Sequence, residues 1–231
     1  RIDQMDPINN EWVQLPSLPR PLCFGAADID AHDRLFFVGG GSSIFRGALC
    51  CREVRMLDGD AWRTVGGLIS PRCGLALASD PRSTLLYAVG GYAGGTEYLA
   101  SAEFFDTSIG RGGLLPPMGA ARSGPGAAYG PDGAVYVVGG SADGNNALAS
   151  AERLDPREGK WHSIPPLPTA RGYLSAVFSL DGCLYAAGGA MNHGTEWACS
   201  AFERFDPRAS AWEELPALAN PRANLAMALV I

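Results

Sequence analysis

The side chains with the clearest chemical potential in this chain of 231 residues are arginines that recur at a regular spacing. A guanidinium group is planar and permanently charged, so it can bind a carboxylate through two parallel hydrogen bonds. A ring of such groups would hold an acidic partner. The open alternative is that each arginine pairs with the acid of a neighbouring repeat unit, in the column formed by Glu103, Glu152 and Glu203. The recurring arginines are Arg20, Arg72, Arg122, Arg171 and Arg222.

The residues that most often carry catalysis or bind metals form no recognisable group. The histidines are His32, His162 and His193, and none is spaced like the metal-binding pattern His-x-x-x-His. The chain contains no Gly-x-Ser-x-Gly elbow and no glycine-rich phosphate loop that opens a helix. The sequence therefore predicts no catalytic residue, no metal site and no cofactor.

The cysteines also lack a metal or disulfide pattern, because no two of them form Cys-x-x-Cys and their spacing does not follow the arginines. A chain of this length does not need disulfides to fold, so we predict thiols in a reducing compartment and a cytoplasmic location. The adjacent pair Cys50 and Cys51 is interpreted as two strand residues that face opposite sides. The full set is Cys23, Cys50, Cys51, Cys73, Cys183 and Cys199.

The elements around these residues are organised by a short apolar run that ends in two glycines. Copies of the run occupy residues 35–40, 86–91, 135–140 and 184–189, at steps of 51, 49 and 49 residues. An aspartate follows each copy, a tryptophan usually follows the aspartate, and a Leu-Pro-like step closes the unit. In the second full unit, Gly112 stands where the tryptophan is expected. Self-similarity at a period near 50 residues indicates a repeat architecture.

Each unit can be resolved into four short strands. In one copy these are residues 125–129, 134–138, 149–154 and 160–164, separated by turns rich in glycine, proline and aspartate. Four antiparallel strands repeated radially are typical of a propeller blade.

With its paired glycines, its Glu-to-Asp step and its spaced tryptophan, the chain resembles the kelch-repeat β-propeller family over nearly its whole length. The resemblance implies an all-β fold with four-stranded antiparallel blades in a single domain. We place strands of a shared closing blade at residues 1–16 and 222–231. Four complete blades are expected at residues 20–66, 71–116, 121–165 and 170–216.

The expected closing blade lacks the strand with paired glycines. Kelch propellers usually have six blades, so that strand and one further blade are expected upstream. The alternative is a five-bladed ring with a gap or with a partner strand in it.

In kelch adaptors of cullin ubiquitin ligases, arginines and loop residues at these positions line a pocket for an acidic peptide. The resemblance therefore implies a protein-interaction module that binds a protein or an acidic peptide. A BTB-type domain upstream in the same polypeptide would make the module the adaptor of a cullin ubiquitin ligase. A scaffold subunit of a larger assembly and a sugar-acting enzyme remain the alternatives. Besides the five arginines, the expected partner-binding residues are Ser43, Phe45, Tyr92, Asn145, Asn146, Asn192 and His193.

Charge and hydropathy narrow the range of partners. The net charge is −6 and the isoelectric point is near 5.0, so the chain lacks the basic surface that binds nucleic acid or anionic lipid. No apolar run approaches the length that spans a bilayer. We therefore predict neither nucleic-acid nor membrane binding.

Overall fold

The computed structural model describes residues 2–6, 8–42, 49–95, 97–191 and 197–228, and within these ranges the secondary structure consists of strands. In this described part, no helix has the length and apolar character needed to cross a membrane. Most strands belong to four antiparallel sheets of four strands each. The prediction of an all-β fold is confirmed.

The four sheets follow the sequence in order. The first contains β3 (Cys23–Ile29), β4 (Leu35–Gly41), β5 (Glu53–Asp58) and β6 (Ala61–Gly67). The second contains β7 (Ala76–Ser79), β8 (Leu85–Val89), β11 (Ala102–Asp106) and β12 (Arg111–Leu115). The third contains β13 (Gly126–Tyr129), β14 (Val135–Val138), β15 (Ala151–Asp155) and β16 (Lys160–Ile164). The fourth contains β17 (Ser175–Phe178), β18 (Leu184–Ala187), β19 (Phe202–Asp206) and β20 (Ala211–Glu214).

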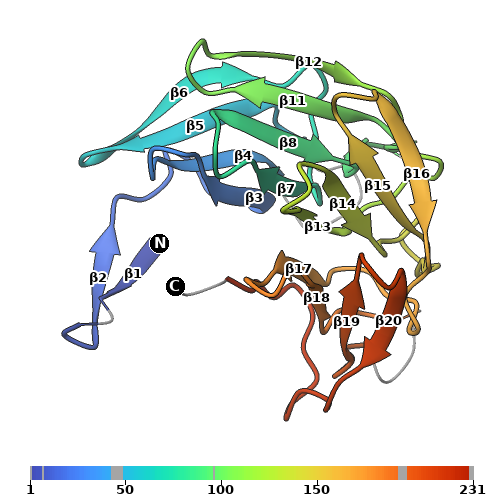
Figure 1. The fold of residues 1–231 in the computed structure, drawn as a ribbon. Helices are drawn as coiled ribbons and strands as arrows, with labels where there is room; N and C mark the ends of the chain where they lie inside the picture. Colours follow the sequence, from blue (N-terminus) through green and yellow to red (C-terminus); the bar gives the residue numbers. More distant parts are fainter. Residues whose placement is uncertain (1, 7, 43–48, 96, 192–196, 229–231) are drawn as a thin grey trace.

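The sheets are the blades of a propeller. They succeed one another in an arc, and the first strand of each, β3, β7, β13 or β17, lies closest to the common axis (Figure 1). Neighbouring innermost strands contact one another around that axis. A small extra hairpin, β9 (Tyr92–Gly94) with β10 (Glu97–Tyr98), lies in the connection between the second and third strands of the second blade.

The hydrophobic core consists of the spaces between blades. Three buried clusters occur in the described part, and each joins two successive blades. All four residues of β14 are buried, because the adjoining blades cover both faces of its sheet. This explains why the apolar run before each glycine pair is continuous and does not alternate.

Tryptophan side chains form hydrogen bonds between successive blades. The indole Nε1–H of Trp62 donates to the carbonyl of Pro16 at 2.8 Å, that of Trp161 donates to Pro116 at 2.7 Å, and that of Trp212 donates to Pro165 at 2.8 Å. Gly112 occupies the equivalent place in the second blade. There a Cβ on Gly110 would lie 2.6 Å from the carbonyl oxygen of Val65, so the two backbones approach closely in place of the indole.

The expected closing blade differs from the four complete ones. Strands β1 (Ile2–Asp6) and β2 (Glu11–Leu15) form a two-stranded sheet of their own, and residues 222–228 form no strand. The two ends of the described chain lie near the opening of the arc (Figure 1). In a complete blade the strand with paired glycines joins the first strand to the third. Among the described residues, β1 pairs with β2 and no strand links it to residues 222–228 in one sheet.

Candidate binding site at the propeller axis

The innermost ends of the blades meet in a ring of backbone hydrogen bonds. Gly74 N–H donates to Phe24 O and Gly124 N–H to Gly74 O, both at 2.7 Å. Tyr173 N–H donates to Gly124 O at 2.6 Å, and Asn224 N–H donates to Tyr173 O at 2.9 Å. The first four residues occupy equivalent places at the start of the four blades, and Asn224 occupies the same place in the segment after the fourth blade, so the bonds fix the radius of the ring.

All five ring residues have a left-handed backbone. Their φ angles lie between 53° and 62°. This conformation favours glycine, and asparagine tolerates it, but an aromatic residue there is strained by about 1–3 kcal/mol. The backbone therefore explains Gly74 and Gly124 but does not explain Phe24 and Tyr173.

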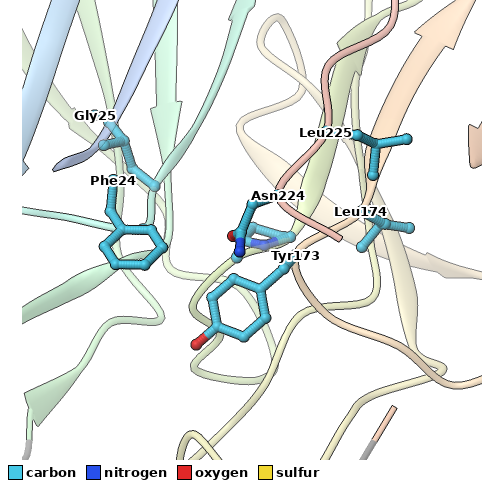
Figure 2. Close-up of a pocket in the computed structure, with 10 residues that line it drawn as sticks. Phe24, Gly25, Tyr173, Leu174, Asn224 and Leu225 are labelled. Atoms are coloured by element: carbon cyan, nitrogen blue, oxygen red, sulfur yellow. The ribbon is translucent and has the colours of Figure 1, made fainter. Parts of the chain in front are cut away.

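A pocket of about 390 Å³ opens at this ring. Figure 2 shows the aromatic rings of Phe24 and Tyr173 at the pocket, with Asn224 beside Tyr173. The two glycines leave the room that side chains would otherwise fill. No lining residue in the described part carries a formal charge. The lining residues are Phe24, Gly25, Gly74, Leu75, Gly124, Pro125, Tyr173, Leu174, Asn224 and Leu225.

The aromatic surface continues beyond the pocket. The ring centroid of Tyr173 lies 6.3 Å from that of Phe24 and 6.4 Å from that of Trp197. Phe24 is 37% exposed and Trp197 is 42% exposed. Burial raises the pKa of the Tyr173 phenol, so the hydroxyl stays protonated and can donate a hydrogen bond. We call Phe24, Tyr173 and Trp197 the aromatic row.

Three of the predicted partner-binding arginines lie inside the protein. The side chains of Arg72, Arg122 and Arg171 are 0% exposed. Their guanidinium nitrogens lie 2.5 Å from Glu103, 2.6 Å from Glu152 and 2.6 Å from Glu203, respectively. Burial lowers the pKa of Arg72 and Arg122, and the neighbouring carboxylates oppose that shift.

These ion pairs organise the connections between blades. The Glu103 carboxylate also accepts from the backbone N–H groups of Ile69 and Ser70, and the Arg122 guanidinium also donates to the carbonyl of Gly139 at 2.8 Å. The arginine-lined mouth expected from the sequence is therefore corrected at these three positions. Each of these three arginines is enclosed with an acid of its own blade, and not with that of a neighbouring blade as the alternative expected, so none of the three guanidinium groups is exposed to a partner.

The other two arginines lie in the segments that lead into the first blade and out of the fourth, Arg20 between β2 and β3 and Arg222 after β20. Arg20 has 53% of its side chain exposed, and it contacts Glu53 at 3.0 Å and the Cys51 sulfur at 3.0 Å. Arg222 is also exposed, while its backbone carbonyl accepts from Gly189 N–H at 2.8 Å.

The structure describes some of the loop residues that were expected to bind a partner. Tyr92 is half-buried, with its ring centroid 5.3 Å from that of Tyr98. Asn145 and Asn146 are exposed, and their backbone N–H groups cap the Asp143 carboxylate. Those N–H groups, from Asn146 and then Asn145, lower the pKa of Asp143. Ser43, Phe45, Asn192 and His193 lie outside the described residues.

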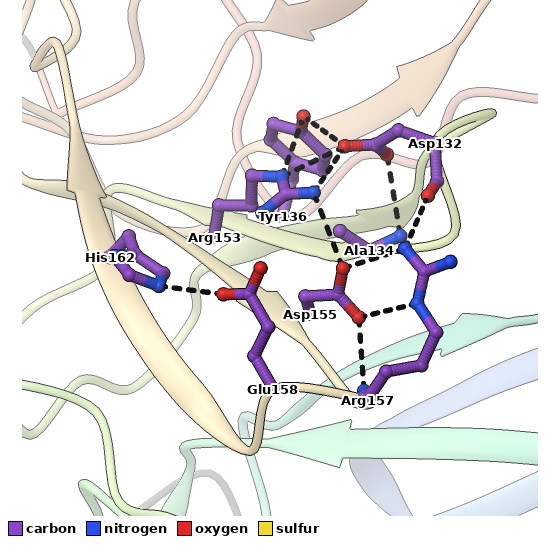
Figure 3. Close-up of polar contacts among 8 residues, drawn as sticks. All are labelled: Asp132, Ala134, Tyr136, Arg153, Asp155, Arg157, Glu158 and His162. Carbon is purple, nitrogen blue, oxygen red and sulfur yellow. Dashed lines mark hydrogen bonds and ion pairs between the residues drawn. The ribbon is translucent and has the colours of Figure 1, made fainter.

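A second group of polar side chains lies at the turns of the third blade, at the opposite ends of its strands (Figure 3). Arg153 contacts Asp132 at 2.8 Å, Arg157 contacts Asp155 at 2.7 Å, and His162 contacts Glu158 at 3.0 Å. The side-chain hydrogen bond from Arg157 lowers the pKa of Asp155. Across the described ranges, no three His, Cys, Asp or Glu side chains converge as metal ligands.

Comparison with known proteins agrees with the architecture. Kelch motif models match residues 122–168 and 170–219, which are the third and fourth blades with their outgoing connections. The radial four-stranded blades define a β-propeller. The third and fourth blades are therefore kelch repeats, and the same residue columns recur in the first two blades.

A solved structure supports the same fold. The structure of YjhT superposes with a TM-score of 0.79 over 94% of this chain and 77% of that chain, at 15% sequence identity. An identity this low establishes similarity of fold alone. No curated protein matches the sequence.

Proposed function

We propose that this kelch propeller is a protein-interaction module that holds a segment of a partner protein in its axial pocket, against the aromatic row. The observation that carries the proposal is the placement of Phe24 and Tyr173 at left-handed positions where glycine suffices in two other blades. Non-glycine residues at these left-handed positions strain the backbone, so the presence of two aromatic residues there is best explained by contact with a ligand.

The pocket has the size and chemistry of a side-chain receptor. Its volume of about 390 Å³ falls in the range of ligand pockets. Aromatic rings that combine an apolar face with a hydrogen-bonding group are enriched among the residues that dominate binding energy. The lining is uncharged, so the partner group that enters is apolar or aromatic, and an acidic residue of the partner would have to lie outside the pocket, near Arg20 or Arg222.

A role as the adaptor of a cullin ubiquitin ligase would use the same surface to capture the protein that is to be modified. A BTB-type domain in the same polypeptide would supply the contact with the ligase.

The experiment uses variants that adopt the residue found in other blades. In Tyr173→Gly and Phe24→Gly, the aromatic ring is removed and the left-handed backbone is relieved, so the propeller should keep or gain stability. Proteins captured from cell extract by the immobilised wild type would be identified by mass spectrometry. The dissociation constant of a purified partner would then be measured for each variant.

Loss of one aromatic anchor should weaken partner binding by roughly 30-fold, as expected for about 2 kcal/mol at a hot spot. Leu180→Ala is the matched control, because Leu180 is 75% exposed and follows β17 at the opposite ends of the strands. Equal partner affinity in all variants would contradict the proposal. Binding to an oligosaccharide array that depends on Tyr173, without any bound protein, would replace it with a sugar-binding function.

A further inference from the structure

The four blades carry equivalent rows of three residues at the end of the strands that faces the pocket. In the first blade the row is Cys23, Gly41 and Cys50, because Gly41 pairs with Cys23 on one side and with Cys50 on the other. The second row is Cys73, Tyr92 and Tyr98, the third is Ser123, Ser141 and Ala147, and the fourth is Gly172, Ala190 and Ala198.

Successive rows meet between the last residue of one and the first residue of the next. Ala147 of the third row and Gly172 of the fourth line the same small cleft. At the corresponding junction between the first two rows, Arg72 N–H donates to the Cys51 carbonyl at 2.9 Å, as Arg171 N–H does to the Leu148 carbonyl at 3.2 Å, so Cys50 and Cys73 flank the first bond as Ala147 and Gly172 flank the second. The junction between the first and second blades therefore brings together two thiols, Cys50 and Cys73, that are 23 positions apart in the sequence.

The two thiols differ in character. Cys50 is half-buried, and the neighbouring Cys73 lowers the pKa of the Cys50 thiol. Cys73 is 6% exposed and its thiol donates to the Tyr92 carbonyl at 3.5 Å, while the neighbouring Cys50 thiol and burial raise the pKa of Cys73. Cys50 is the more exposed of the two thiols, so a dissolved oxidant reaches Cys50 first, and Cys73 is the thiol that then attacks the oxidised Cys50.

We propose that Cys50 and Cys73 are a redox pair, which closes to a disulfide between the first two blades beside the axial pocket. Cys73 directly precedes Gly74 of the backbone ring, and Cys23 precedes Phe24. The bond would therefore join the connection after β4 to the wall of the pocket.

The oxidant fitted to this pair is a small peroxide. The Cys50 thiolate attacks one peroxide oxygen, the O–O bond breaks, and hydrogen peroxide yields Cys50 sulfenic acid and one water after proton transfer. The Cys73 sulfur then attacks the Cys50 sulfur, the S–O bond breaks, and the hydroxyl leaves as a second water with the Cys73 proton. Two electrons pass from the two sulfurs to the peroxide, and an external dithiol reverses the change.

The neighbouring cysteines are poorer partners for Cys50. The Cys51 sulfur is engaged by the Arg20 guanidinium at 3.0 Å, next to Glu53. Cys23 lies on the far side of Gly41, two strand spacings from Cys50. Two spacings amount to roughly 10 Å between Cα atoms, beyond the separation of about 7 Å that a disulfide tolerates.

Peptide mapping tests the pair directly. The reduced protein is treated with hydrogen peroxide, remaining thiols are alkylated, and trypsin is applied without reductant. Cleavage after arginines releases residues 47–52 and residues 73–82 as separate peptides. The expected product is one species in which these two peptides are linked, and dithiothreitol should separate them. The variant Cys51→Ser should keep the link, since it leaves one cysteine in residues 47–52.

The variants Cys50→Ser and Cys73→Ser should lose the link. The control Cys199→Ser, which changes a cysteine of the fourth blade, should keep it. Circular dichroism of each reduced variant checks the fold, and Cys50→Ser alone is decisive if Cys73→Ser does not fold. The proposal is overturned if the link survives in Cys50→Ser, if Cys23 replaces either residue in the wild-type product, or if peroxide leaves both thiols reduced.

Discussion

Arg122 and Glu152 form a charge pair within one blade, 2.6 Å apart, with 0% and 8% of their side chains exposed. The guanidinium also donates to the carbonyls of Gly139 and Ser150, and the carboxylate accepts from Gly119 N–H. The pair thus joins the entering connection, the glycine pair and the third strand of the blade. Its burial makes it part of the scaffold of the propeller.

The first prediction concerns this pair. Arg122→Ala leaves the Glu152 carboxylate buried without its counter-charge, so the free energy of unfolding should fall by about 3–5 kcal/mol. Urea denaturation measures the loss. Arg20→Ala is the control, because Arg20 is half-exposed and should lose less than about 1 kcal/mol. Similar losses in the two variants would show that the pair does not hold the blade together.

The second prediction compares two tryptophans from the same column of the repeat. Trp161 packs on the core between the second and third blades and donates to Pro116, whereas Trp12 in β2 is 69% exposed. Trp161→Ala should therefore destabilise the protein by about 3–5 kcal/mol, as large aromatic truncations do. Trp12→Ala should change the free energy of unfolding by less than about 0.5 kcal/mol. A calorimetric melting series distinguishes them, and a large loss in Trp12→Ala would indicate a packing partner for that hairpin.

The strand positions were predictable because the repeat supplies the same local signals several times. The apolar run, the glycine pair and the turn residues agree in phase, so errors in one unit are corrected by the others. The incomplete blade could be recognised from the sequence because one of those signals was missing. In the structure, this blade is split into the hairpin β1–β2 and an irregular segment at residues 222–228. That split depends on which strands pair with one another, and local sequence signals do not predict pairing.

The role of the arginine column could not be decided from sequence. A scaffold residue and a recognition residue that recur in every blade produce the same column, and burial is a property of the assembled blades. The aromatic row had a weak signal, since Gly74 and Gly124 stand two residues after their arginines and Tyr173 and Asn224 take the same place. The approach of Cys50 to Cys73 crosses a blade boundary and has no counterpart in spacing.

The third prediction concerns acid stability. Burial of Asp30 raises the pKa of its carboxyl, but hydrogen bonds from Arg34, from Thr107 and from backbone N–H groups outweigh this and lower it to about 2. Thr107 belongs to the second blade and Asp30 to the first, so the network joins them. The folded pKa lies below the unfolded value near 3.9, so the stabilisation is present above about pH 4 and is lost as the pH falls towards 2.

Asp30→Asn should cost on the order of 1–3 kcal/mol at neutral pH, and its deficit relative to wild type should shrink as the pH falls through this range. Urea midpoints measured over a pH series supply the comparison. Thr107→Val, which removes one donor, should show a smaller version of the same dependence. A deficit that stays constant with pH would mean that the carboxylate charge is not what stabilises this contact.

The fourth prediction separates backbone strain from steric exclusion at two glycines of the third blade. Gly139 and Gly159 both have a φ of 63°, but a Cβ on Gly139 would lie 2.4 Å from the carbonyl oxygen of Arg171, whereas one on Gly159 would meet nothing within 4 Å. Gly159→Ala should therefore cost only the left-handed penalty of about 1–2 kcal/mol. Gly139→Ala carries the same penalty and must also displace the backbone of the next blade, so it should lose clearly more. Chemical denaturation of both variants gives the difference, and equal losses would mean that the blade interface yields without cost at the paired glycines.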